Sequence, residues 1–203
     1  MTLTELQTDV LKEVINIGVG YAASSLNDLV GTHVSLTVPD AALLTLEEAK
    51  VRIQMHGMAS FSAVQMNFSG LLKGNVALLF PSDSAAKLVS LLTGEETGAG
   101  DLDGLRAATL EEAGNILLNG MVGSISNLID GHLAFSIPHY TAEGELPNRL
   151  LALTGEDGSH VILARARFDV AQHQIEGEIL LFLEIGSIEI LMAALDRYVQ
   201  QLI

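Results

Sequence analysis

A spaced set of three residues occurs twice in this chain, once near its start and once in its middle. The set is a glutamate, an asparagine three positions later and a proline twenty-three positions after that. Its two copies are the first motif, Glu13, Asn16 and Pro39, and the second motif, Glu112, Asn115 and Pro138. A period of roughly one hundred residues is longer than the 20–50 residues of solenoid repeats. The spacing therefore predicts one body built from two related halves.

The two halves are expected to cover residues 1–97 and 101–203, within a single domain that spans 1–203. The Gly-rich acidic stretch at 95–104 is the obvious seam, because turn-forming residues gather there. The stretches at 74–92 and 177–195 match in their pattern of apolar residues. We expect a pseudo-two-fold arrangement that carries two copies of the polar set.

The hydrophobic pattern predicts the same order of elements in each half. The first half is expected to have a helix from the capping box at Thr4 and Gln7 to about Val30 with a stop at Gly31, β segments at 33–38 (ended by Pro39), 51–55, 63–68 and 74–80, and a helix at 81–94. The second half is expected to have a helix at 103–129 with a stop at Gly131, β segments before Pro138 and at 149–154, 161–168 and 177–183, and a helix from 187. The fold class is α+β, with an antiparallel or mixed sheet packed against two long and two shorter helices.

Composition narrows the classes of function. A net charge of −15 repels phosphate backbones, and the ten Lys and Arg residues are scattered, so nucleic acid is a poor partner. No uninterrupted apolar run is long enough to span a membrane, and the start of the chain has no signal-peptide pattern. Without cysteine there is no disulfide framework or thiol chemistry. These observations predict a cytoplasmic protein.

Common catalytic patterns are missing. The chain contains no phosphate-binding loop, dinucleotide fingerprint, nucleophile elbow or HExxH zinc motif. The six histidines include no pair at metal-ligand spacing on one helix. Each histidine is therefore expected to be a strand or loop residue and not a metal ligand.

Polar residues form a short stripe on the first predicted helix. Asp9, Glu13 and Asn16 are four and three positions apart, so they share a face. A carboxylate can pair with a cation of a partner, and an amide can both donate to and accept from water. Gly18 and Gly20 lie in the middle of this helix, where close helix packing would explain both. The alternative is that Gly20, one turn beyond Asn16, leaves the surface bare for a partner. A single stripe is explained better as a solvated helix face, but that does not explain its recurrence.

This constellation resembles the CheC family of chemotaxis phosphatases. The family signature is Asp or Ser, three residues, Glu, two residues, Asn, twenty-two residues and Pro. The first copy matches in full from Asp9, while the second has Ala108 at the first position, with Thr109 next to it. The resemblance covers nearly the whole chain. Flagellar-switch relatives, which carry additions before or after this body, are expected to fit less well.

The resemblance implies a protein phosphatase that hydrolyses the aspartyl phosphate of a CheY-like response regulator in chemotaxis or related two-component signalling. Asn16 and Asn115 would orient the attacking water, and Glu13 and Glu112 would dock the receiver's lysine. The remaining implied roles are partner contacts at Asp9, Gly20 and Asn119 and structural roles at Pro39 and Pro138. Mg²⁺ would be supplied by the receiver, so no cofactor belongs to this chain.

Other expectations concern partners and the weight of each site. A CheD-like deamidase is a possible further partner, and the duplication predicts a monomer. Because the first motif is complete and the second has Ala108, Asn16 is expected to carry at least half of the activity. Two alternatives stay open: a non-catalytic module that binds response regulators or serves as a flagellar-switch adaptor, and an unrelated acidic α/β fold with a chance motif.

Overall fold

The computed structural model describes residues 2–31, 33–54, 61–94, 102–141, 160–170, 173–184 and 186–202. Its helices are α1 (Glu5–Val30), α2 (Leu46–Gln54), α3 (Ser82–Thr93), α4 (Leu102–Leu128) and α6 (Ser187–Leu202). Its strands are β1 (Val34–Thr45), β2 (Phe61–Gly70), β3 (Gly74–Pro81), β4 (Leu133–Phe135), β5 (His139–Thr141), β6 (His160–Val170) and β7 (His173–Leu183). No helix in these ranges is long and apolar enough to cross a membrane.

The strands form one seven-stranded antiparallel sheet in the order β1-β6-β7-β3-β2-β4, in which β5 also pairs with β2. The α+β class is confirmed. If β1, β2 and β3 are exchanged with β4/β5, β6 and β7, the order reads the same from the opposite edge. This is the order that two halves related by a two-fold axis would give.

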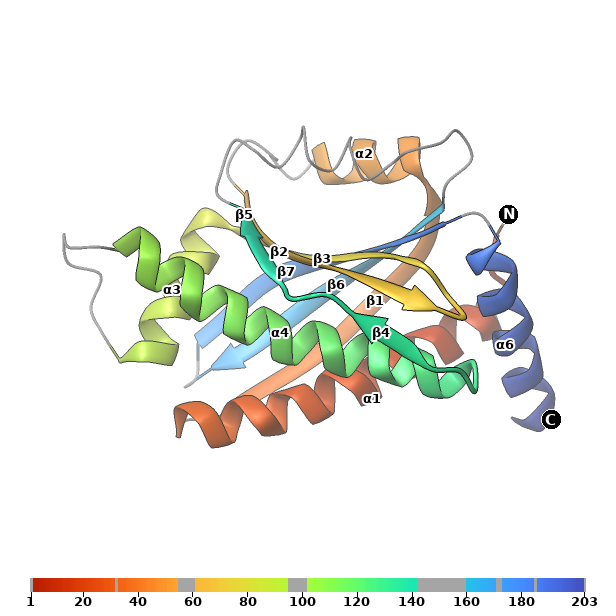
Figure 1. Cartoon of the computed structure of the whole chain (residues 1–203), viewed down its shortest axis with the longest axis horizontal. Coiled ribbons are helices and arrows are strands. Elements are labelled where there is room, and N and C mark those ends of the chain that lie inside the picture. Colours follow the sequence, from red (N-terminus) through yellow and green to blue (C-terminus); the bar gives the residue numbers. More distant parts are fainter. Residues whose placement is uncertain are drawn as a thin grey trace.

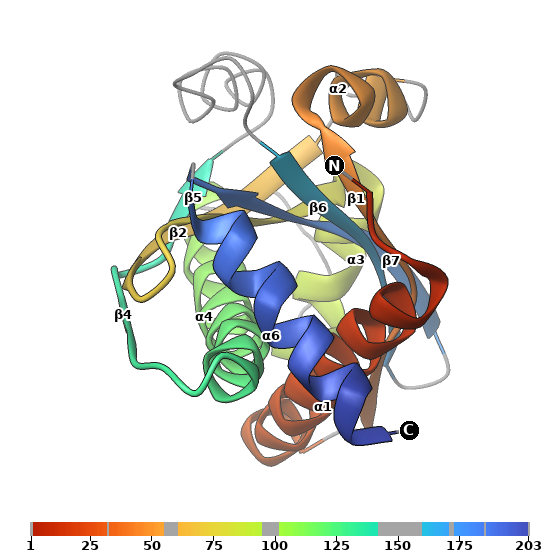
Figure 2. The same ribbon diagram turned by 90° about the vertical axis from the view of Figure 1, so that its right-hand side faces the viewer.

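Helices cover both faces of the sheet unequally. Figures 1 and 2 show α1 and α4 along one face, with α3 and α6 at the two ends of that layer, and α2 on the opposite face. The main core fills the space between the sheet and the larger helical layer. A smaller core lies under α2 and includes Ala49, Phe61 and Phe182. The long helices therefore present their outer faces to solvent.

The two long helices touch backbone to backbone. A Cβ atom placed on Gly18 of α1 would lie 2.4 Å from the carbonyl oxygen of Gly120 on α4, and a Cβ on Gly120 would lie 2.6 Å from the carbonyl oxygen of Gly18. Close helix packing thus explains Gly18. Gly20 is different, because a Cβ there would meet nothing within 4 Å.

Local signals at the ends of α1 behave as the sequence predicts. The Thr4 side chain accepts a hydrogen bond from the Gln7 N–H, and the Gln7 side chain accepts one from the Thr4 N–H, which forms the capping box. Gly31 follows the helix in the left-handed conformation, with φ 62°. The buried strand expected at 74–80 is β3, whose inner residues are all buried.

The expectation that Pro39 ends its β segment was wrong. β1 continues to Thr45, and its pairing with β6 shifts register between Thr37 and Asp40. Pro39 lies in this bulge, where a ladder hydrogen bond from its missing N–H is not required. Proline is therefore accommodated inside a long edge strand.

The β segment expected at 51–55 was also wrong, because residues 46–54 form α2. Thr45 and Glu48 make a second capping box: the Thr45 N–H donates to the Glu48 carboxylate at 2.8 Å, and the Glu48 N–H donates to Thr45 Oγ1 at 3.3 Å. The hydrogen bonds from Thr45, with that from its backbone first, lower the pKa of the Glu48 carboxyl. The sheet face under α2 is apolar, so it offers this helix a surface to pack on. The structure therefore has one more short helix than the two that the sequence predicts. The strand expected at 149–154 lies outside the described residues.

Candidate functional site

The first motif lies on the outer face of α1. Glu13 is exposed, and within the described part of the chain its carboxylate makes no hydrogen bond or ion pair. Asp9, one turn earlier, is exposed and pairs with Lys12 at 3.2 Å. Gly20 leaves the next turn open. The free Glu13 carboxylate is thus available to a cation of a partner.

Asn16, in contrast, is held by the backbone of the neighbouring strand. Its Nδ2 donates to the Val38 carbonyl oxygen at 2.9 Å and to the Lys12 carbonyl oxygen at 2.9 Å. Its Oδ1 accepts from the Val38 N–H at 2.7 Å. The amide therefore pairs with the free edge of β1 as another strand would, immediately before the bulge at Pro39. In the first motif this pairing places Asn16 directly beside the bulge at Pro39.

Replacing Asn16 by alanine is expected to destabilise the fold. Val38 is 1% exposed, so its N–H and carbonyl would be left buried without a partner. We expect a loss of about 2 kcal/mol in the free energy of unfolding and a fall in Tm of about 4–8 °C. Asn115→Ala, measured by the same thermal and urea unfolding, should cost less than about 1 kcal/mol. Equal costs for the two substitutions would contradict this account of Asn16.

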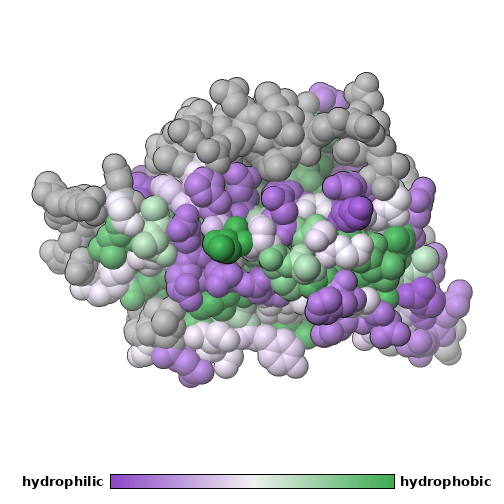
Figure 3. Space-filling view, viewed as in Figure 1, coloured by the Kyte–Doolittle hydropathy of each residue, from purple (hydrophilic) through white to green (hydrophobic). Residues whose placement is uncertain are grey.

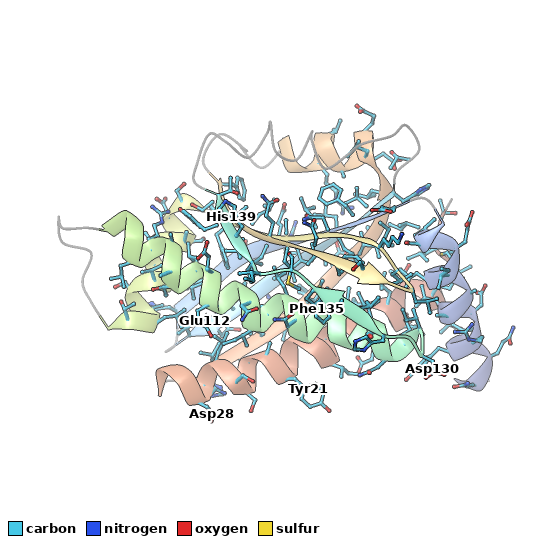
Figure 4. The ribbon with its side chains drawn as sticks, viewed as in Figure 1. Tyr21, Asp28, Glu112, Asp130, Phe135 and His139 are labelled. Carbon is cyan, nitrogen blue, oxygen red and sulfur yellow. The ribbon has the colours of Figure 1, made fainter. Side chains whose placement is uncertain are left out.

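The second motif lies on α4, where Figure 4 labels its glutamate, Glu112. Glu112 is exposed, and Asn115, one turn later, is partly exposed. Asn115 Oδ1 accepts a hydrogen bond from Asn119 Nδ2 at 2.7 Å. Among the described residues Asn115 Nδ2 has no hydrogen-bond partner. The second asparagine thus keeps a free donor where the first has none.

Glu111 ties the strand to the helix in the second half. Its Oε1 accepts a hydrogen bond from the Tyr140 N–H at 2.8 Å, two residues after Pro138. The corresponding residue of the first half is Lys12. The strand attachment that Asn16 provides in the first half is thus supplied by a neighbouring glutamate in the second. Sequence reasoning missed Glu111, although the change from Lys to Glu between the copies was a visible signal.

Pro138 also lies at a shift in register. Phe135 of β4 lies opposite Phe68, whereas His139 of β5 lies opposite Gln65, so the strand gains one residue between these pairs. Proline is tolerated there for the same reason as at Pro39. Both motif prolines therefore mark bulges in the outer strands of the sheet.

The two motifs form separate sites. α1 and α4 run antiparallel: Val14 and Ile17 line one groove with Ser124, whereas Leu26 lines another hollow with Glu112. This second hollow has a volume of about 300 Å³ and also includes Ala108, where the signature expects Asp or Ser. The missing side chain leaves the site more open next to Glu112.

Each site offers a carboxylate and an amide one turn apart, but no metal cage. Within the described ranges there is no group of three or more His, Cys, Asp or Glu residues arranged to hold a metal ion. A carboxylate of this kind can anchor a cationic group, and a free amide can position a water molecule. The geometry suits an accessory site that completes a partner's reaction centre.

Comparison with known proteins agrees with this arrangement. Residues 6–42, which hold the first motif, match the model of the CheC-like family. The CheY-P phosphatase CheC of Bacillus subtilis is 27% identical over 95% of this chain and 95% of its own length.

Two solved structures share the fold. FliY of Thermotoga maritima superposes with a TM-score of 0.73 at 19% identity, covering 97% of this chain and 99% of that chain. The CheX structure from Borrelia burgdorferi, determined as a complex with CheY, BeF3 and Mg²⁺, gives a TM-score of 0.54 at 16% identity, covering 85% of this chain and 99% of that one.

Proposed function

We propose that this chain, which belongs to the CheC/CheX/FliY family, is a phosphatase that hydrolyses the aspartyl phosphate of a CheY-like response regulator. One observation carries the proposal: among the residues that the structure describes, the Asn115 amide donor has no partner and lies one helical turn from an exposed Glu112 carboxylate that is also unpaired. The Bacillus subtilis relative, a CheY-P phosphatase, supports the choice of substrate.

Catalysis in this proposal is mainly positional. Asn115 enters the receiver's active site, where its amide holds a water molecule in line with the phosphorus atom. Glu112 pairs with the receiver's lysine and fixes the docking geometry. The amide has a donor for this task because Glu111 has taken over the attachment of the strand at Tyr140.

The metal ion belongs to the substrate. Mg²⁺ binds oxygen ligands and usually retains several waters, which suits the acidic cluster of a receiver. The two motif glutamates, Glu13 and Glu112, contribute one carboxylate to each site and act on the receiver's lysine. The chain itself then needs no cofactor.

The hydrogen bonds favour the second motif as the main catalytic site. Asn16 can reach a receiver's phosphoryl group only by giving up three hydrogen bonds, two of which satisfy the buried Val38. Asn115 can reach the phosphoryl group without breaking any hydrogen bond of its Nδ2 within the described residues. This weighting is opposite to the one that the complete first motif suggests from sequence alone.

A second candidate function is a docking module without catalysis, such as a flagellar-switch adaptor. The engaged amide of Asn16 favours it for the first motif, because Glu13 there can still pair with a cation while the amide is occupied. The shared fold with FliY is compatible with either role. A docking module protects the phosphorylated receiver, whereas a phosphatase shortens its lifetime.

Phosphate release from candidate phosphorylated receivers separates the two functions. We expect catalytic amounts of the protein to accelerate release at least tenfold over the receiver's own hydrolysis, because positioning a water replaces a random encounter. Addition of EDTA should stop the reaction by removing the receiver's Mg²⁺. A receiver whose lifetime is unchanged or lengthened by the protein would reject the phosphatase.

A further inference from the structure

Ile137 is the most exposed large hydrophobic residue in the part of the chain that the structure describes. It is 89% exposed, whereas Val38, which holds the same position before the motif proline in the first half, is 1% exposed. The first bulge thus directs the side chain of Val38 into the core, and the second directs the side chain of Ile137 to solvent. In the first half the bulge buries its apolar residue and engages Asn16; in the second it exposes the residue and leaves Asn115 free.

This exposure is built into the strand. Before the bulge, the Ser136 N–H donates to the Asn67 carbonyl oxygen at 2.9 Å, and the Asn67 N–H donates to Ser136 Oγ at 2.9 Å. After the bulge, His139 pairs with Gln65 in the sheet. Backbone pairing on both sides therefore holds Ile137 outward.

The exposed side chain lies beside the second motif. Glu111, which precedes Glu112 on α4, binds the Tyr140 N–H and so fixes the strand after the bulge against the helix. Phe135, two residues before Ile137, is 40% exposed and overlies α4 in Figure 4. Figure 3 shows an isolated hydrophobic patch among hydrophilic residues where the chain passes from β4 to β5. An apolar contact surface thus lies on the strand segment that is fastened to α4 next to Glu112 of the second motif.

We infer that Ile137 is a docking residue for the receiver domain and packs on apolar surface next to the receiver's phosphorylated aspartate. The inference rests on the proposed function and names the contact that would hold the partner at the second motif. Net charge does not supply this affinity, since the chain carries −15 and the phosphorylation site of a receiver is acidic apart from the lysine that Glu112 binds. Burial of an exposed isoleucine is independent of these charges and is effective near the centre of an interface.

A second copy of this chain is the competing occupant of the surface. It would bring the same net charge of −15 against itself, and it would cover the free donor of Asn115. A receiver instead places its phosphoryl group next to that donor. The adjacency of Ile137 to the motif therefore favours the receiver.

The test compares Ile137→Ala with Val51→Ala, a control that removes a 56% exposed apolar side chain on α2, across the sheet. Binding is measured to a receiver activated with beryllofluoride. Turnover is measured in an Asn16→Ala background, so that it reports the second motif. Ile137→Ala should raise Kd and KM roughly tenfold and leave kcat within about twofold, because a buried contact of this size is lost from ground and transition states alike. Val51→Ala should change none of these quantities.

Each result decides between the two proposals. Unchanged Kd and KM in an active Ile137→Ala protein would overturn the docking role while the phosphatase stands. Binding that depends on Ile137 without any phosphate release would overturn the phosphatase and leave the docking role. Self-association of the wild type that Ile137→Ala abolishes, with receiver binding intact, would assign the surface to a second copy and reject the inference.

Discussion

Gly18→Ala, which adds a single methyl group to α1, is expected to cause a large loss of stability. The added methyl group would lie 2.4 Å from the Gly120 carbonyl oxygen and 2.8 Å from the Met121 Cα atom, and neither backbone atom can rotate away. α1 and α4 must then separate, which removes packing along their shared contact. We expect a cost of at least about 3 kcal/mol and a fall in Tm of roughly 6–12 °C, measured by calorimetry.

Gly20→Ala is the matched control for this experiment. It adds the same methyl group to the same helix two residues later, where nothing lies within 4 Å. Replacing an exposed helical glycine by alanine should stabilise the protein by about 1 kcal/mol. If both variants shifted Tm by the same amount and in the same direction, the close contact between the helices would not be the reason for Gly18.

Sequence patterns predicted the long helices well because their signals are local. The capping box at Thr4, the period of the apolar residues and Gly31 act within a few residues of each other. The strand order was not predicted from the sequence, because it depends on pairing between residues far apart in the chain.

The two errors have different causes, one a distant strand pairing and the other a combination of a local cap and a distant apolar surface. Proline normally stops a strand, but at Pro39 a bulge removes the need for its N–H, and this depends on pairing with β6, over one hundred residues away. The alternating residues after Val51 suggest a strand, yet the Thr45 and Glu48 capping box and an apolar sheet face favour a helix. At Pro39 a distant partner decided between two locally acceptable structures, whereas at α2 a local capping box acted together with the distant sheet face.

The difference between the two motifs is likewise invisible in their spacing. Asn16 and Asn115 occupy equivalent positions, and only the structure shows that one amide is bound to Val38 while the other retains a free donor. Complete agreement with the signature favoured the first motif. The hydrogen bonds instead make Asn115 the better catalytic candidate, although its motif matches the signature less completely.

Asn115→Ala is therefore expected to lower kcat for receiver dephosphorylation by roughly tenfold or more, while Asn16→Ala lowers it less than about twofold. Loss of a group that only positions water in the transition state reduces kcat and leaves receiver binding nearly unchanged. The double variant should lose roughly 100-fold, because both sources of an oriented water are gone. Rates are measured under saturating receiver at a temperature at which Asn16→Ala remains folded.

Asn127→Ala provides the control, since Asn127 is an exposed asparagine on α4 outside the motif. It should retain the wild-type kcat, which excludes a general effect of removing an amide from this helix. A larger loss in Asn16→Ala than in Asn115→Ala, with both proteins folded, would return the main catalytic role to the first motif and require its amide to leave Val38 on binding. Wild-type turnover in the double variant would remove the water-positioning role from both asparagines, so that only docking through Glu13 and Glu112 would remain.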